Sequence, residues 1–530
     1  MPSDCITYEE SGYYSKIIID YLNQNTDIEP FYNRFSSVEN FENQIVEKAK
    51  NYSLENRKVL VDVLKKQYLQ VDTSELVTKN IALLEKSNTF SITTGHQLNL
   101  FTGPLYFLYK IISTINICKQ LNNKYLHQNF VPLFWMATED HDFEEINYFN
   151  FKDKKIKWSK NVSGPVGRLS TEGLDAVLAV FESQLGTSEN ALFLKKMFQK
   201  AYLKHKNLAA ATRFLANELF KNEGLIILDA DSSDLKKLMI PHFKDELLQQ
   251  SSYKTVSETN EKLLNYDIQV NPREINLFYI ENNLRERIVF ENGIYKINST
   301  KIEFSKDQIL QELENFPEKF SPNVILRPLY QEVLLPNLAY IGGGGEIAYW
   351  LQLKSTFEHH KITFPMLVLR NSVLLISEKQ LKKTQQLQLS VTDLFLKRNA
   401  LLNKKTNQLS KITIDFEGLK ATLKTQFQLL QDVAKQTDKS FTGAVNAQET
   451  KQLKGLLNLE KRLLKAEKRI YKETLDRIID LQEALFPGES LQERKQNFAE
   501  FYIEVGPDLI SKISEELDPF SNEFSVILVG

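Results

Sequence analysis

Four clusters of polar or glycine residues each follow a short apolar run, and they mark where this sequence could carry chemistry. The clusters occupy residues 94–97, 139–142, 229–231 and 342–346. Short runs that are apolar on both faces predict buried strands of a parallel sheet. Because ligands of such sheets bind beyond the carboxyl ends of the strands, we expect the four clusters to border one binding site.

The cluster Glu139-Asp140-His141-Asp142 combines three carboxylates with one histidine. Such groups can bind a divalent metal, transfer protons or hold an ammonium group. Adjacent residues of an extended chain point in opposite directions, so all four side chains cannot reach one ligand. We therefore favour recognition of a polar substrate here over a metal site.

Two glycine-containing segments have the composition of anion-binding loops. They are Gly342-Gly343-Gly344-Gly345, before a predicted helix that Glu346 opens, and Thr102-Gly103, before Pro104 at the start of another. Backbone N–H groups at a helix start attract phosphates and carboxylates. A tight turn or a plain helix start is the alternative, since neither the G-x-G-x-x-G nor the P-loop pattern is present.

Three further positions have both a functional and a structural interpretation. Asp229 and Asp231 could line the site or cap the following helix. Arg327 could pair with a substrate carboxylate or form a structural salt bridge. His359-His360 ends a predicted helix with no acidic neighbour beyond Glu358, so we expect this pair at the surface.

Strands and helices alternate along most of the chain before residue 378. We predict strands near residues 90–93, 131–137, 225–228, 338–341 and 364–369, and helices that include 207–221 and 346–359. This alternation predicts an α/β fold with a doubly wound parallel sheet. Residues 151–205 and 252–320 interrupt the alternation, and Asn292-Gly293 in the second block predicts a hairpin turn.

These patterns divide the chain into parts. The parts are an N-terminal helical region with the first part of the core (1–150), a first insertion (151–205), the continued core (206–251), a β-rich second insertion (252–320), the completed core with the glycine loop (321–377), an antiparallel coiled-coil hairpin (378–487) and a C-terminal segment packing on the core (488–530). Apolar residues at steps of three and four indicate the coiled coil, with residues 437–446 separating its arms. Its narrow apolar seam could pair with a second subunit.

Composition excludes several classes of protein. The chain has 530 residues, of which 42% are hydrophobic and 25% charged, with a formal charge of −2. This is globular composition, and it gives no global field for nucleic acid. Two cysteines, Cys5 and Cys118, cannot form a disulfide framework or a Cys-rich zinc site. Without a signal peptide or an apolar stretch of about 18 residues, we expect no membrane association and a cytoplasmic location.

Several long motifs together resemble the bacillithiol biosynthesis cysteine-adding family, BshC. The motifs are TGHQLNLFTGPLYFLYK, VPLFWMATEDHDFEE, LDAD, SPNVILRPLYQEVLLPNLAYIGGGGEIAYWLQL and LQERKQNFAEFYIEVGPDLI, and they span essentially the whole chain. Many relatives read GQQ where this chain has Gly95-His96-Gln97. The resemblance implies a Rossmann-like core, related to class I aminoacyl-tRNA synthetases, with connecting-peptide insertions and a coiled coil used for homodimerisation.

The resemblance also implies a reaction, in which the carboxyl group of cysteine is joined to the amine of glucosaminyl malate. A carboxylate and an amine do not condense in water without activation, so we expect ATP with Mg²⁺, through a cysteinyl adenylate or an acyl phosphate. ADP is the alternative bound nucleotide, and no tightly bound metal is expected. The synthetase signatures HIGH and KMSKS are missing from the chain.

Position and chemical type give each candidate residue a role under this hypothesis. His96, His141 and Asp142 are the catalytic candidates, with either histidine taking the amine proton. The substrate-binding candidates are Thr94, Gly95, Gln97, Glu139, Asp140, Arg327, Glu346 and Tyr349, and the nucleotide- or anion-binding candidates are Thr102, Gly103, Gly342, Gly343, Gly344 and Gly345. Among these, Arg327 suits the malate carboxylates through a bidentate contact.

Two other functions remain open from the sequence. A synthetase-like nucleic-acid-binding protein would explain the core and the hairpin, although the charge of −2 counts against it. A metal-dependent hydrolase would use the cluster at residues 139–142.

Overall fold

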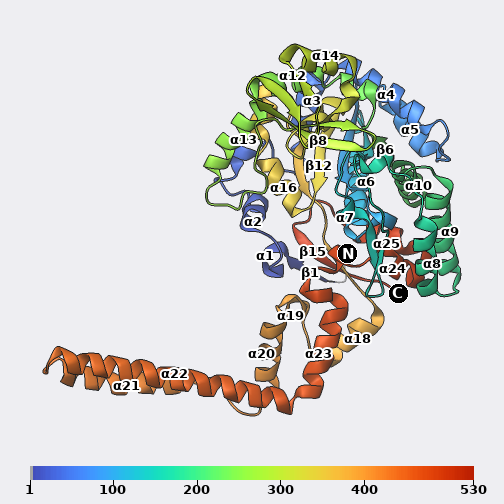
Figure 1. The fold of residues 1–530 in the computed structure, drawn as a ribbon. Coiled ribbons are helices and arrows are strands. Elements are labelled where there is room, and N and C mark those ends of the chain that lie inside the picture. The colour runs from blue at the N-terminus through green and yellow to red at the C-terminus, as the bar shows by residue number, and fades with distance from the viewer. Residues whose placement is uncertain (1–3) are drawn as a thin grey trace. The chain divides into compact units, whose positions relative to one another are not determined.

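A computed structural model describes residues 4–530 of the chain (Figure 1). The chain forms two compact units, one made of the residues up to Leu375 together with Gln492–Gly530, the other of Ile376–Leu491. Among the described residues, no helix is both long and apolar enough to cross a lipid bilayer.

A five-stranded parallel sheet forms the centre of the first unit. Its strands are β2 (Thr89–His96), β3 (Asn129–Met136), β6 (Ile226–Asp229), β12 (Asn337–Gly342) and β13 (Met366–Leu369). They lie in the order β13-β12-β2-β3-β6 with every neighbouring pair parallel. If the five strands are numbered along the chain and read from β6 to β13, their order is 3-2-1-4-5. This is the order of a doubly wound sheet, and it confirms the predicted Rossmann-like fold.

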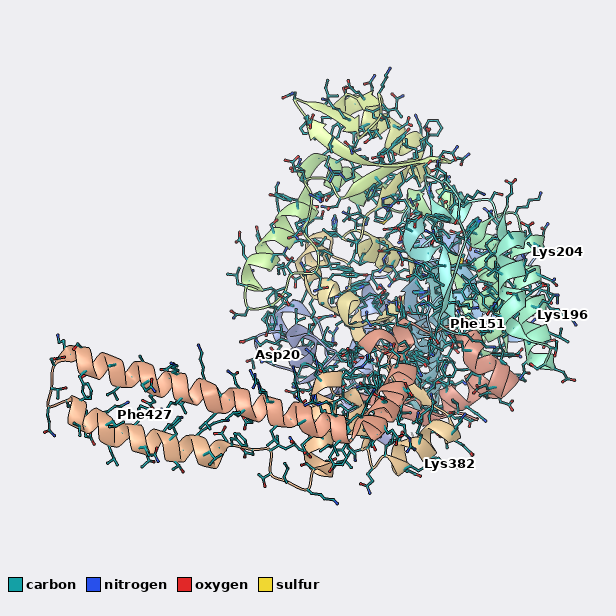
Figure 2. All side chains as sticks on the ribbon, turned by 60° about the horizontal axis from the view of Figure 1, so that its bottom comes forward. Asp20, Phe151, Lys196, Lys204, Lys382 and Phe427 are labelled. Carbon is teal, nitrogen blue, oxygen red and sulfur yellow. The ribbon has the colours of Figure 1, made fainter. Side chains whose placement is uncertain are left out.

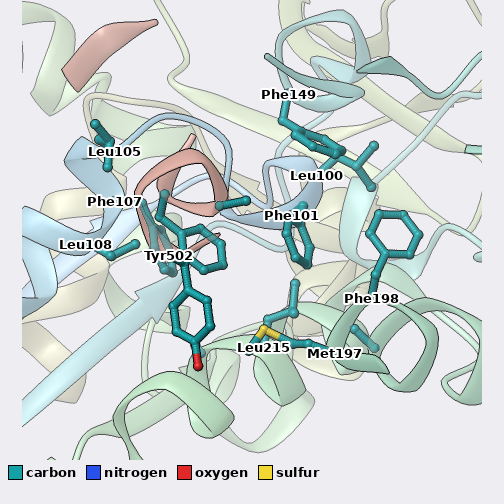
Figure 3. Packing of buried hydrophobic residues seen from close by; sticks show 14 of the residues in the cluster. Leu100, Phe101, Leu105, Phe107, Leu108, Phe149, Met197, Phe198, Leu215 and Tyr502 are labelled. Atoms are coloured by element: carbon teal, nitrogen blue, oxygen red, sulfur yellow. The ribbon is translucent and has the colours of Figure 1, made fainter. Parts of the chain in front are cut away.

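The direction of winding reverses between β2 and β12, and the residues of both strands are buried on both faces. All eight residues of β2 and all six of β12 are buried. Helix α6 (Tyr106–Lys124) follows β2 and packs its buried face on the sheet. Figure 3 shows part of the core beside it, where Phe101, Phe149 and Phe198 meet. Such a sheet opens a crevice at its reversal point.

Two predicted boundaries are wrong. Residues 94–96 were expected in a loop, but they extend β2 because they pair with Phe134, Trp135 and Met136 of β3. The helix predicted over 346–359 is two helices, α16 (Gly344–Leu351) and α17 (Lys354–His360).

Two insertions separate strands of the central sheet along the sequence, and each forms structure of its own. The first contains the strands β4 (Tyr148–Phe151) and β5 (Lys154–Lys157) and the helices α8 (Leu174–Leu185) and α9 (Glu189–Lys204). The second is an antiparallel sheet of β7 (Leu277–Glu281), β8 (Leu284–Glu291), β9 (Ile294–Ile297), β10 (Glu303–Phe304) and β11 (Phe320–Pro322). The predicted hairpin at Asn292-Gly293 is confirmed: both residues have positive φ, 51° and 84°, as its tight turn requires.

The chain returns to the first unit at its C-terminal end. Strand β15 (Glu523–Leu528) pairs antiparallel with β1 (Asp4–Thr7) and lies beside β14 (Val373–Ile376). Between Gln492 and β15, helices α24 (Phe498–Val505) and α25 (Leu509–Glu516) complete the unit.

The C-terminal segment also holds a strained turn before α6. Phe101, Thr102 and Gly103 have φ of 47°, 67° and 66°. A Cβ on Gly103 would lie 2.6 Å from Cβ of Asn99, so glycine is required there. The buried Asn497 side chain donates to the carbonyls of Phe101 and Gly103 at 2.8 and 2.6 Å. These bonds stabilise a conformation that L-residues rarely adopt.

The second unit is helical. It contains α18 (Glu378–Gln386), α19 (Val391–Phe395), α20 (Arg398–Leu409), α21 (Glu417–Ala434), α22 (Lys439–Ile470) and α23 (Lys472–Leu485). Figure 2 shows α21 and α22 side by side, and Phe427 packs there with Ala434 and Val445. The predicted separation over 437–446 is wrong, because Asp438 caps α22 and the turn is confined to 435–438.

Replacing Asn497 with alanine tests the anchoring of the strained turn. We expect the Asn497→Ala change to lower the free energy of unfolding of the first unit by about 3 kcal/mol, because two buried carbonyls and the cap of α24 lose their partners. All three tryptophans, Trp135, Trp158 and Trp350, lie in this unit, so urea unfolding followed by tryptophan fluorescence reports on it. Asn88→Ala, at an exposed side chain with a bond to one carbonyl, is the control. Equal effects of the two changes would contradict this role.

Candidate active site

A cavity of about 800 Å³ lies at the carboxyl ends of β2, β3 and β12. The antiparallel sheet contributes its other wall through residues that include Phe278, Arg285 and Pro322. Of the predicted site residues, the structure brings together Gly95, His96, Gln97, Glu139, Asp140, His141, Arg327, Gly343, Gly344, Gly345, Glu346 and Tyr349 around it. The cavity therefore occupies the reversal point of the sheet, where the strand order favours ligand binding.

Five predicted residues do not line this cavity. The Thr94 hydroxyl donates to the carbonyl of Ile341 at 2.8 Å inside the sheet. Asp142 caps α7 (Phe143–Ile146) instead. Thr102 and Gly103 belong to the strained turn that Asn497 holds, and Gly342 ends β12 and accepts a bond from the Arg370 amide at 2.9 Å. Local backbone geometry accounts for these residues without a ligand.

An ion pair between the buried Lys110 and the partly buried Glu346 joins the two sides of the reversal point. Lys110 of α6 lies 2.5 Å from Glu346 of α16 and donates to the carbonyl of Gly95 at 2.7 Å. Glu346 also accepts bonds from the Tyr340 hydroxyl at 2.6 Å and from the Gly343 amide at 2.9 Å. The Gly343 amide is therefore occupied by Glu346 in this structure.

Charge and burial set the ionisation of this pair. Burial raises the pKa of Glu346, but the Lys110 charge and the hydrogen bonds outweigh it and hold the pKa at about 2. Burial lowers the pKa of Lys110, and Glu346 opposes that effect. Glu346 is therefore a carboxylate at neutral pH.

His96 is buried against aromatic rings at the cavity wall. Its ring lies 5.3 Å from that of Tyr106 and 5.2 Å from that of Phe107. Burial, and then the Lys110 charge, lowers its pKa to about 3. Such an imidazole stays neutral at pH 7 and is a weak base, which argues against His96 as the group that takes a proton from an amine.

Asp140 and His141 face Arg285 across the cavity. The Arg285 guanidinium lies 2.6 Å from Nδ1 of His141, and that nitrogen is 3.6 Å from the Asp140 carboxylate. Asp140 also accepts bonds from the Gln97 amide group at 2.9 Å and from the His141 backbone at 2.7 Å. Although burial raises the pKa of Asp140, these hydrogen bonds and the Arg285 charge hold it well below its usual range. Arg285 stacks 3.9 Å from the Phe278 ring centroid.

Glu139 points toward a different partner. Its carboxylate pairs with the fully buried Lys236, which also donates to the carbonyl of Phe320. Burial raises the pKa of Glu139, and the Lys236 charge opposes the shift. Adjacent carboxylates of the 139–142 cluster thus have separate partners, as the alternation of side chains along the chain requires.

The cavity is rich in cations. Seven cationic residues line it, namely Lys110, Arg273, Arg285, Arg287, Arg327, Arg370 and Arg494, against the three carboxylates of Glu139, Asp140 and Glu346. Nε of Arg285, Nη2 of Arg327 and Nε of Arg370 are buried and have no hydrogen-bond partner within residues 4–530. Buried donors without a partner are costly, so an anion that accepted these bonds would bind favourably.

Aromatic rings and a distant carboxylate position these arginines. Arg327 lies 5.5 Å from the Tyr340 ring centroid and donates to the Gln331 side chain at 3.1 Å. Arg370 directly follows β13 and donates to the buried carboxylate of Glu493 at 2.6 Å. The C-terminal segment therefore holds one wall of the cavity in place.

The sequence analysis missed Lys110, Arg285 and Arg370, and two of them carried a signal. Lys110 is a single cation in the apolar run FLYKII, and a lone charge on a buried helix needs a partner. Arg370 follows a strand, as the four predicted clusters do. Arg285 carried no comparable signal, because its place on the cavity depends on how the antiparallel sheet folds back.

Asp229 and Asp231 lie beside a second cavity. Asp231 forms a bidentate ion pair with Arg168 at 2.7 Å for both bonds, and the Thr138 hydroxyl donates to Asp229 at 2.6 Å. These two carboxylates have structural partners and do not line the main cavity.

A doubly wound sheet with a cation-rich cavity at its reversal point is typical of proteins that bind small anionic ligands. Comparison of the sequence with known protein families identifies the family within this class. The description "Bacillithiol biosynthesis BshC, N-terminal Rossmann-like domain" matches residues 1–371, and the BshC C-terminal coiled-coil domain matches residues 373–529. The chain belongs to the BshC family of bacillithiol biosynthesis.

Curated relatives agree over the full length. A protein of Flavobacterium johnsoniae named "Putative cysteine ligase BshC" is 62% identical over 529 residues, covering 100% of both chains. Proteins of the same name from Flavobacterium psychrophilum and Christiangramia forsetii are 61% and 54% identical, covering 99% and 100% of both chains.

The ion pair at the reversal point predicts a pH dependence of stability. The pKa of Glu346 is about 2 in the folded protein against an ordinary 4.5, so the folded state binds this proton more weakly than the unfolded state. The resulting stabilisation is present above pH 4.5 and is lost as the pH falls toward 2. We expect Glu346→Gln to destabilise the first unit at pH 7 and to differ less from wild type at pH 3.

Urea unfolding followed by tryptophan fluorescence at pH 7, 5 and 3 measures this difference. Glu258→Gln is the control, because Glu258 is an exposed carboxylate on α13 (Ser251–Lys262). A difference between wild type and Glu346→Gln that stays constant over this range would exclude the ion pair as its cause.

Proposed function

We propose that this chain is a cysteine ligase that joins the carboxyl group of L-cysteine to the amine of glucosaminyl malate. The names of the full-length relatives support the ligase assignment. The observation that carries the proposal is the cation-rich cavity at the reversal point, with its three unpartnered guanidinium nitrogens. The cysteine carboxylate, the malate carboxylates and a nucleotide phosphate chain are all anions that such a cavity suits.

We propose ATP as the activating substrate. The cysteine carboxylate attacks the α-phosphorus and releases pyrophosphate, or attacks the γ-phosphorus and releases ADP. The neutral glucosamine nitrogen then attacks the activated carbonyl carbon, AMP or phosphate leaves with the C–O electron pair, and the nitrogen loses one proton as the amide forms. Mg²⁺ accompanies the nucleotide and neutralises part of its charge.

We assign the residues of the cavity to different chemical groups of these substrates. Arg285 and Arg327 bind carboxylates or phosphates, because each presents a buried unpartnered nitrogen. Asp140, which is ionised, holds an ammonium group or sugar hydroxyls. The unoccupied sides of Gly344 and Gly345, where a Cβ would meet only side chains at 3.5 Å or more, allow a ligand to approach the start of α16.

His141 is our candidate for the group that takes the amine proton. It lines the cavity and is half exposed, whereas His96 is buried and weakly basic. Nδ1 of His141 accepts from Arg285, so an anion that binds Arg285 would compete for that guanidinium and release the nitrogen. Binding of the anionic substrate and proton transfer are then linked through one arginine.

The two alternative functions have less support. A metal hydrolase would need the carboxylates of residues 139–142 to converge, but Glu139 pairs with Lys236 and Asp142 caps α7. These residues form no group of three metal ligands in the part of the chain that the structure describes. A nucleic-acid-binding protein would use cations on an open surface, whereas here the arginines gather inside a cavity.

Mass spectrometry tests the proposal directly. The purified full-length protein is incubated with cysteine, glucosaminyl malate and ATP-Mg²⁺, and each component is omitted in turn. We expect a thiol with the mass of cysteinyl-glucosaminyl-malate only in the complete mixture, together with AMP or ADP in equal amount. Product without ATP would overturn the activation step, and no product in any mixture would overturn the ligase assignment for the isolated chain.

Variants in the same assay distinguish anion binding by Arg285 from proton transfer by His141. We expect Arg285→Gln to lower kcat/KM by about 10- to 100-fold, mainly through KM, because a charged hydrogen bond to an anion is lost. We expect His141→Gln to lower kcat by about 100-fold or more. Arg462→Gln and His127→Gln, at exposed residues outside the cavity, are the matched controls.

We also propose that the coiled coil pairs two copies of the chain. Leu419, Leu430 and Leu459 on α21 and α22 are about half exposed, although they occupy the apolar spacing of a coiled coil. We expect sedimentation equilibrium to give twice the chain mass, and Leu430→Glu with Leu459→Glu to give the monomer mass. A monomeric wild-type protein would refute the pairing.

A further inference from the structure

A cluster of histidine and aspartate residues lies outside the cavity and has no part in the proposed reaction. His242 and Asp245 stand three residues apart on α12 (Ile240–Gln249), and His359 and His360 end α17. Residues three apart share one face of a helix. We expected His359-His360 at the surface with no acidic neighbour beyond Glu358. His359 is exposed as predicted, but the His360 side chain is only 5% exposed, and Asp245 lies next to both.

Three side chains of this cluster bring ligand atoms close to one another. Oδ2 of Asp245 is 3.1 Å from Nε2 of His359 and 3.8 Å from Nε2 of His360, and all three atoms lie within 4.8 Å of one another. Ligands of a tetrahedral zinc ion, bound at about 2.0–2.2 Å, are separated by about 3.4 Å. The observed separations lie on either side of that value.

His360 provides a second, independent observation. Its Nε2 is buried and finds no hydrogen-bond partner in the described part of the chain, residues 4–530. At 3.8 Å the Asp245 carboxylate is too far for a hydrogen bond but well placed to share a cation. A buried nitrogen without a partner is costly, and a bound cation would remove that cost.

His242 orients His360 from the opposite side. The Nδ1 atoms of the two rings are 3.1 Å apart. When Nδ1–H of His360 donates to His242, Nε2 of His360 keeps its lone pair and faces Asp245. Histidines that bind metals usually have such a partner on their other nitrogen, which fixes the tautomer and the ring orientation.

We propose that Asp245, His359 and His360 bind a divalent transition-metal ion of the Zn²⁺ class, with water at the remaining position. Two imidazoles favour zinc, cobalt or nickel over magnesium and calcium, which prefer oxygen ligands. The neighbouring lysines do not oppose the ion strongly, because Lys244 and Lys354 already have acidic partners at 3.8 and 2.7 Å.

Such an ion would tie α12 to α17. These helices are joined by more than a hundred residues of intervening chain, and α17 directly follows α16, which carries Glu346 and Tyr349 at the cavity. The ion therefore clamps the helices behind the glycine loop and takes no part in the chemistry. Because it binds the folded protein, it raises thermal stability in proportion to its occupancy.

Metal titration of the untagged full-length protein tests this site. The protein is freed of metal with a chelator, and Zn²⁺ is added by calorimetric titration and in thermal unfolding scans. We expect one Zn²⁺ per chain and a rise in Tm of about 4 °C at about 100 times the Kd. Replacing Zn²⁺ with Co²⁺ is expected to give the visible absorption of four-coordinate cobalt.

Variants locate the ion. His360→Gln, Asp245→Asn and His359→Gln are each expected to lower Zn²⁺ affinity at least 10-fold and to remove the rise in Tm, whereas His127→Gln retains both. His359 is exposed and Asp245→Asn conserves size, so these two variants keep the test valid if His360→Gln does not fold. Absence of stoichiometric Zn²⁺ binding, or equal binding by Asp245→Asn and wild type, would overturn the proposal.

Discussion

The ammonium group of Lys110 stands where the central sheet reverses its winding, bonded to the carbonyl of Gly95 on one side and to Glu346 on the other. The two elements it joins, α6 and α16, follow β2 and β12, the adjacent strands of the two halves. A buried lysine without a carboxylate would be strongly disfavoured. The ion pair therefore fixes the start of α16 relative to β2, and with it one side of the cavity.

The fold and the edge of the sheet that carries the site could be predicted from the sequence, because both depend on local patterns. Apolar runs predict strands, and polar residues after them predict a shared edge. Partners across the chain could not be predicted in this way. Arg370 and Glu493 are 123 residues apart, and Asp245 and His359 are 114 apart. The strand end at residues 94–96 was missed because pairing with β3, and not local composition, extends β2.

The cavity concentrates positive charge in a chain whose formal charge is −2. Gathering cations raises the free energy of the empty site, and the structure offsets this with rings and carboxylates behind the guanidinium groups, such as Phe278 behind Arg285 and Glu493 behind Arg370. Nε of both arginines is buried and has no hydrogen-bond partner in the described residues. The site is thus organised before a ligand arrives, so little reorganisation is needed when an anion binds.

The path of the chain constrains how this protein is made. Strand β1, at the start of the described residues, pairs with β15, which ends at Leu528. During synthesis β1 and then the whole helical unit leave the ribosome before β15 does. Arg370 likewise cannot form its ion pair until Glu493 has been synthesised. The first unit therefore cannot complete the sheet of β1, β15 and β14, or its cavity, until β15 and Glu493 have been synthesised.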